Sequence, residues 1–152
     1  MNLYGRYDLQ VTLGDAVIKS MSFENGIVNE GKDCVLNTFL GAVAKSTWYF
    51  GLIASGAVLN SADTLASHAG WDEVTAYDGN RKECVISSAA SGKEVVSDVA
   101  SFTMTAETDI RGSFLCNAET GTSGTLFSTA LCTEFTAPDE SIVRVRYTLG
   151  IK

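Results

Sequence analysis

The chain has 152 residues, a formal net charge of −7 and 45% hydrophobic residues. This length and apolar content predict one domain over residues 1–152 with one core. The acidic balance argues against direct binding to nucleic acid, because neutralising phosphates requires clustered Lys and Arg. The longest apolar run, residues 48–54, is far shorter than the roughly 20 residues of a membrane-spanning helix, so we expect no membrane partner.

The N-terminal residues predict a β-hairpin. Apolar and polar side chains alternate over residues 7–13, which is the period-two pattern of a strand with one buried face. Gly14-Asp15 marks a turn, and residues 16–23 form a second strand that ends at a turn containing Asn25-Gly26. We interpret residues 1–28 as an N-terminal hairpin or arm.

Residues 32–44 predict one short N-terminal helix. Asn29 or Gly31 is expected to cap it. Its apolar residues recur at helical spacing and would line one side of the helix: Val35, Leu36, Phe39, Leu40 and Val43.

The remaining chain predicts strands. Residues 48–54, WYFGLIA, are bulky and apolar on both faces, so we expect a central strand that lies deepest in the core. The clearest alternation follows at residues 141–151, with one apolar and one basic face. Several short strands and one helix predict a mainly β fold, a jelly-roll-like β-sandwich. Further short strands are expected at residues 83–87, 101–106, 112–116 and 125–131.

The longest irregular segment, residues 55–81, holds most side chains that could carry chemistry. A serine hydrolase needs a nucleophile on a glycine-flanked elbow, and Ser67 has no such neighbours. A metal site from Asp63, His68 and Glu73 matches no standard ligand spacing. We prefer a structural interpretation, in which Asp63 and Ser67 cap local turns and His68 forms one hydrogen bond in a packed loop.

The cysteines and glycines add no catalytic motif. A cysteine nucleophile would have to use His68, the only histidine, and no cysteine stands in a nucleophile signature. Residues 121–124, GTSG, lack the lysine of a phosphate-binding loop. We therefore predict no catalytic residue, no metal and no cofactor. The four cysteines would permit three pairings, but they are widely spaced and we expect them to be reduced: Cys34, Cys84, Cys116 and Cys132.

The tryptophans and Tyr77 allow two interpretations. Large aromatic residues anchor protein interfaces, but they also fix loops on a sheet. We expect Trp48 to lie in the core. For Trp71 and Tyr77, packing and partner binding remain equally compatible with the sequence.

One part of the chain resembles a family of small tailed-phage structural proteins. WYFGLI is followed by ADTLASHAGWDEVTAY, residues 62–77, and then by Arg81. The family pattern is W-Y-x-G-L-I, then D-T-x-x-S-H-A-G-W-x-E, then Y and R, and the resemblance extends over residues 29–150. It implies a capsid decoration or cement protein on the outside of the virion head, assembled in the host cytoplasm. Its partners would be the major capsid protein and further copies of itself, as a dimer or trimer.

The resemblance also indicates a candidate docking loop. Gly70 would permit a bend before Trp71, and Glu73 could pair with Arg81 at the far end of the loop. Two alternatives remain: a tail or head-fibre component, and a carbohydrate-binding module that would use the aromatic and acidic residues 71–77. The candidate docking loop is defined by eight residues: Asp63, Thr64, Ser67, His68, Trp71, Glu73, Tyr77 and Arg81.

Overall fold

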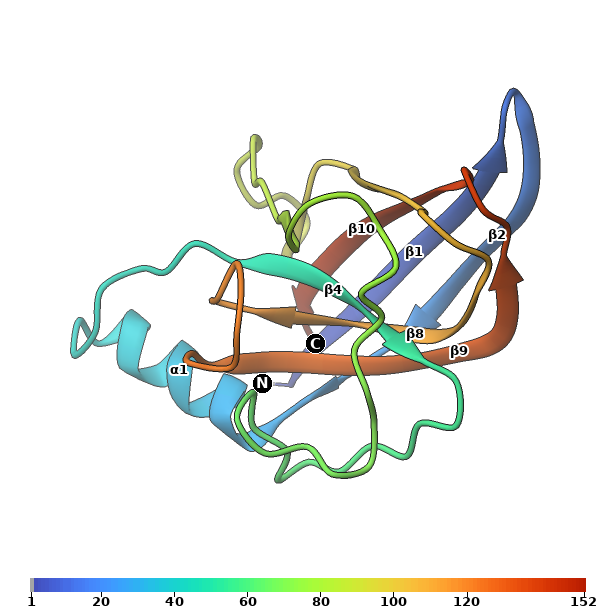
Figure 1. Ribbon diagram of the computed structural model, residues 1–152. Helices are drawn as coiled ribbons and strands as arrows, with labels where there is room; N and C mark the ends of the chain where they lie inside the picture. Colours follow the sequence, from blue (N-terminus) through green and yellow to red (C-terminus); the bar gives the residue numbers. More distant parts are fainter. Residues whose placement is uncertain (1) are drawn as a thin grey trace.

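The computed structural model describes residues 2–152 (Figure 1). Strands hold 49% of the residues and helix 7%, and the strands form two antiparallel five-stranded sheets. The predicted β-sandwich with one short N-terminal helix is therefore confirmed. Sheet 1 contains β2 (Ala16–Glu24), β1 (Leu3–Leu13), β10 (Ile142–Ile151), β6 (Glu94–Val96) and β7 (Ala100–Thr103). Sheet 2 has the order β3 (Gly26–Ile27), β9 (Leu126–Ala137), β8 (Thr108–Cys116), β4 (Tyr49–Ala54) and β5 (Lys82–Glu83).

The predicted N-terminal hairpin is present and belongs to sheet 1. Strands β1 and β2 pair antiparallel, and Gly14 at the turn has a left-handed φ of 57°. Strand β1 also pairs with β10, from Leu3 opposite Ile151 to Thr12 opposite Ile142. The expected turn at Asn25-Gly26 is not a hairpin turn, because the chain crosses there from β2 in sheet 1 to β3 in sheet 2.

The helix differs from its predicted bounds. Helix α1 (Asn29–Phe39) begins earlier and ends earlier than residues 32–44. Its N-cap is Val28, with no side-chain cap, and not Asn29 or Gly31 as predicted. Gly31 is instead needed for close packing, since an added Cβ would collide with the backbone of Phe127 in β9.

Gly41 ends α1. It adopts a left-handed φ of 75°, which continues poorly into a helix but suits a C-terminal cap. The N–H groups of Leu40 and Ala42 bond back to carbonyls of the last turn. The apolar residues after Val35 do not form the predicted buried stripe, whether they lie inside the helix or beyond it: Leu36, Phe39, Leu40 and Val43 are all exposed.

The main core lies between the sheets and is organised around Tyr7. Its ring contacts Tyr147 at 4.7 Å and Phe50 at 6.3 Å between ring centroids. The Tyr7 hydroxyl is hydrogen-bonded to Ser128 Oγ of the opposite sheet at 2.8 Å, which satisfies a polar group that burial would otherwise penalise. Tyr7 and Phe50 are fully buried.

The outer face of sheet 2 is also covered, and this explains why β4 is apolar on both of its faces. Phe50 and Leu52 join the main core, whereas Ile53 belongs to a second cluster with Trp71 and Phe114. The segment 55–81 crosses this face (green in Figure 1). The predicted deep burial is confirmed within β4, because Phe50, Leu52 and Ile53 are fully buried. The strand begins at Tyr49 and not at Trp48, and it is not central, because its neighbour on one side is the two-residue edge strand β5.

Several strand bounds were predicted less well. β5 is only Lys82–Glu83 where residues 83–87 were expected, β7 ends at Thr103, and β6 was not predicted. β8 and β9 extend beyond the predicted 112–116 and 125–131, since they pair with each other as far as Thr108 opposite Ala137. Their pairing, and not an apolar pattern, defines these ends.

Candidate functional site

Trp71 fixes the middle of the candidate docking loop on sheet 2. Its ring is 4% exposed and lies 5.1 Å from the Phe114 ring. Its Nε1–H donates to Asp63 Oδ2 at 3.1 Å, and the same oxygen accepts the Asn60 N–H at 3.0 Å. The buried indole is thus held by both packing and a charge-assisted hydrogen bond.

His68 is part of the same structural unit. Its ring stacks on Trp71 with 3.8 Å between centroids, and its Nδ1 lies 3.0 Å from the Trp71 carbonyl oxygen. A carbonyl only accepts, so Nδ1 carries the proton. The expected single hydrogen bond of His68 in a packed loop is confirmed.

Thr64, and not Ser67, provides the side-chain cap of the local turn. The Ser67 N–H donates to Thr64 Oγ1 at 3.1 Å, and the two residues also exchange backbone hydrogen bonds. The Ser67 side chain is exposed. The expectation for Asp63 holds, because its carboxylate accepts the Asn60 N–H.

Gly70 has a different role from the one expected. Its φ lies outside the left-handed region, so no special bend requires glycine there. Its carbonyl accepts the Val58 N–H at 2.8 Å, and an added Cβ would collide with the Val58 carbonyl oxygen. Glycine therefore allows two parts of the loop to lie backbone against backbone.

Arg81 and Glu73 close the far end of the loop, as expected. Arg81 donates from Nε at 2.8 Å and from Nη2 at 2.7 Å to the two Glu73 carboxylate oxygens. Arg81 also donates to the Ala118 carbonyl at 2.9 Å and lies 5.3 Å from the centre of the Phe114 ring. The hydrogen bonds to Glu73 raise the pKa of Arg81. Arg81 is 7% exposed and the Glu73 side chain is 22% exposed, so this is a partly buried pair and not a fully exposed surface salt bridge.

Tyr77 is packed inward. It is 8% exposed and meets Phe102 edge to face, with 4.8 Å between ring centroids. Burial raises the pKa of its hydroxyl well above the usual range. Tyr77 and Trp71 are therefore packing residues, which answers the question that the sequence left open.

The structure thus joins Asp63, His68 and Trp71 in one network and Glu73 and Arg81 in another. Thr64 and Ser67 form a separate turn, and Tyr77 packs on Phe102. Their polar groups hold the loop in place, and His68, the only histidine, is hydrogen-bonded to the Trp71 carbonyl oxygen. Within residues 2–152, no three His, Cys, Asp or Glu side chains are grouped to hold a metal ion. Nor does this part of the chain contain a helix long and apolar enough to cross a membrane. The four cysteine thiols are free.

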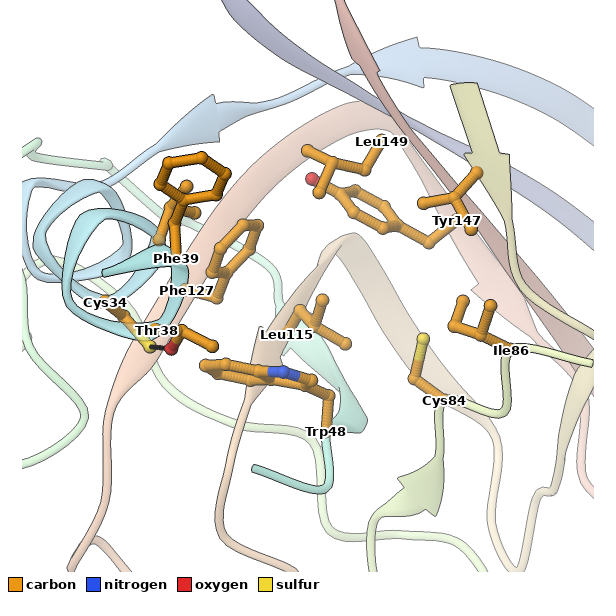
Figure 2. A pocket seen from close by; sticks show the side chains of 12 residues that line it. Cys34, Thr38, Phe39, Trp48, Cys84, Ile86, Leu115, Phe127, Tyr147 and Leu149 are labelled. Atoms are coloured by element: carbon orange, nitrogen blue, oxygen red, sulfur yellow. Dashed lines mark hydrogen bonds between the residues drawn. The ribbon is translucent and has the colours of Figure 1, made fainter. Parts of the chain in front are cut away.

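An apolar pocket lies next to α1 and was not predicted. It has a volume of about 340 Å³, and its walls come from α1, sheet 1 and sheet 2 (Figure 2). Trp48, expected in the core, is half-buried and forms part of the wall. Burial raises the pKa of two wall residues, Cys84 and Tyr147, to about 12 each.

One sequence signal accompanies this pocket. Between Asp33 and Asp63 the only charged residue is Lys45, although the chain as a whole is strongly acidic. The pocket itself could not be found from the sequence, because Cys34 and Leu149, which both line it, are far apart in the chain.

Comparisons of the chain with family models and with curated proteins found no match.

Proposed function

We propose that the protein is a structural component of a tailed-phage particle, a capsid decoration protein that binds the outside of the head and stabilises contacts between major capsid proteins. The observation that carries this proposal is the structural role of the eight residues of the candidate docking loop. They fix a long loop on a β-sandwich, through Trp71 and Arg81. Glu73, Tyr77 and Arg81 also line a small pocket of about 170 Å³ at the far end of the loop. The resemblance of residues 29–150 to phage structural proteins supplies the class of particle.

A preordered loop suits this role. Docking costs less free energy when the bound conformation already exists, because fewer backbone and side-chain torsions must be ordered. In this loop the anchors point inward, and exposed residues are spread along its length. We call three of them, which lie next to the anchors His68 and Trp71 in the chain, the tip: Ala66, Ser67 and Ala69. We assign this tip to the contact with the major capsid protein.

Burial of the aromatic residues argues against the carbohydrate-binding alternative. Sugars stack on exposed aromatic faces, and Trp71 and Tyr77 are 4% and 8% exposed. A tail or head-fibre component would have the same fold at another place in the particle, so only its location distinguishes it from a head protein.

The test is binding to purified expanded heads that lack the protein. We expect saturable co-sedimentation at a fixed copy number per head, and electron microscopy should locate the added density on the head surface. Binding should weaken by about 10-fold or more with Ala66→Glu/Ala69→Glu, because two charges would be placed in the contact. Ala89→Glu, at an exposed position outside the loop, is the matched control. Density on the tail, or no binding to heads, would refute the proposal.

A further inference from the structure

The exposed apolar residues of α1 form a patch on the surface. The α1 patch consists of Leu36, Phe39, Leu40 and Val43, which are 59%, 85%, 77% and 48% exposed. The first three lie on one side of the helix, at positions i, i+3 and i+4. An exposed group of large apolar side chains of this kind marks a surface that another molecule covers.

The apolar pocket opens beside this patch. Figure 2 shows Phe39 on α1 facing Phe127 at the edge of the pocket, with Trp48 and Leu115 further along the wall. None of the residues that line it is charged. An apolar cavity of about 150 Å³ already accepts benzene, so a pocket of about 340 Å³ has room for a phenylalanine ring and part of a second side chain.

The geometry of this surface points to a second copy of the chain as the occupant, because the same surface carries both a protruding ring, Phe39, and an apolar pocket. Two copies with a net charge of −7 each repel one another over most of their surfaces. Residues 34–44, which include the α1 patch, contain no charged residue. If two copies meet through residues 34–44, this segment places no carboxylate and no unpaired charge in the contact.

We propose that the α1 patch and the adjoining pocket form a two-fold interface between two copies of the chain, in which Phe39 of each copy enters the pocket of the other. A two-fold interface requires one surface to supply both the protruding group and its receptor. Here the most exposed large apolar side chain stands at the rim of an apolar pocket. This self-association is a property of the isolated protein and does not depend on a place in a particle.

Sedimentation equilibrium of the purified full chain tests the interface. We expect a concentration-dependent dimer, and Phe39→Asp should weaken it by about 100-fold or more, because the substitution acts twice in a two-fold contact. Val58→Asp is the matched control, since Val58 is 70% exposed and lies outside the patch. It should change the dimer constant by less than about threefold. A chain that stays monomeric at millimolar concentration, or a Phe39→Asp dimer as tight as the wild type, overturns the proposal.

Tryptophan fluorescence gives a second, site-specific measurement. Trp48 lies in the pocket wall, whereas Trp71 is buried elsewhere and provides a constant background. Acrylamide quenching of Trp48 should fall as the protein concentration rises, and Phe39→Asp should abolish this protection. A dimer in which Trp48 stays equally accessible places the interface elsewhere and overturns the proposal. The proposal is also overturned if Trp48 is protected only in the monomer and only after an apolar dye, anilinonaphthalene sulfonate, is added. In that case the pocket binds a small molecule and not a second copy of the chain.

Discussion

Helix α1 and the irregular loop of residues 55–81 both pack against sheet 2, but they differ in how far their large apolar residues are buried. The loop has no long strand or helix of its own, but it buries Leu65, Trp71 and Tyr77. The helix is regular, but it leaves Leu36 and Phe39 exposed. Order in the loop comes from satisfied polar groups and packed rings, and it does not require regular backbone hydrogen bonding.

This difference separates stability from binding. The buried residues of the loop should contribute to the free energy of unfolding, because their partners are inside the same chain. Residues of the α1 patch should contribute little to it, because they are 48% to 85% exposed. Substitutions at Trp71, at Arg81 and in the α1 patch test this division, and alkaline pH tests the burial of the pocket wall.

Trp71→Ala should have the largest effect. It removes a ring that packs on Phe114 and stacks with His68, and it leaves the Asp63 carboxylate without its indole donor. We expect a loss of about 3–5 kcal/mol in the free energy of unfolding, measured by urea denaturation. Trp71→Phe keeps part of the packing but not the hydrogen bond, so it should lose less. A loss below about 1 kcal/mol for Trp71→Ala would show that the loop is not anchored by this residue.

Arg81→Gln should have the next largest effect. It breaks a bidentate pair and leaves Glu73, whose side chain is 22% exposed, without its cation. Removing one partner of a buried pair costs about 3–5 kcal/mol, and the partial exposure of Glu73 lowers our expectation to about 2–4 kcal/mol. A double-mutant cycle with Glu73→Gln should give a coupling of about 1–3 kcal/mol. Additive single effects in thermal or urea unfolding would contradict the pair.

Alkaline pH should destabilise the wall of the pocket. Burial raises the pKa of Tyr147 from 10.0 to about 12, so the folded chain holds this proton longer than the unfolded chain does. Its contribution is complete below pH 10 and is lost as the pH rises to 12. The loss amounts to roughly 2–3 kcal/mol.

Cys84, whose pKa burial raises from 9.0 to about 12, should act in the same direction from pH 9. Urea unfolding at a series of pH values measures the total loss of stability, and the difference in tyrosinate absorbance between the wild type and Tyr147→Phe reports the ionisation of Tyr147, one of five tyrosines. Cys84→Ala should remove part of the loss that begins near pH 9, because burial also raises the pKa of Cys116 and Cys132. Constant stability between pH 8 and pH 12 would contradict burial of both groups.

The elements that could be predicted from the sequence are those in which local pattern and burial agree. β1 and β10 alternate in polarity, and β4 is apolar throughout because two different structures cover its two faces. The Glu73–Arg81 pair could also be expected. β6 could not, because Glu94–Val96 is a strand only through its pairing with Thr148, Leu149 and Gly150.

The exposure of one side of α1 could not be predicted from the sequence. Apolar residues at helical spacing predict a helix with one apolar face, but the spacing does not say what covers that face. In the structure the helix packs against β9 where Gly31 meets the Phe127 backbone, and Val35 packs against the main core, but Leu36 and Phe39 stay exposed. The pocket depends on side chains from Cys34 to Leu149, so only the tertiary structure places it.

Substitutions in the α1 patch should have the smallest effect on unfolding. Leu36→Ser and Leu40→Ser each replace an apolar side chain that is mostly solvated in the single chain, so the change should stay below about 0.5 kcal/mol. Leu65→Ala is the matched control in the loop, because Leu65 is fully buried and its truncation should cost about 2–5 kcal/mol. Urea unfolding at a protein concentration where the chain is monomeric measures both. If the two patch substitutions cost as much as Leu65→Ala, α1 would be held by apolar contacts within the chain, and the patch would not be free for a second molecule.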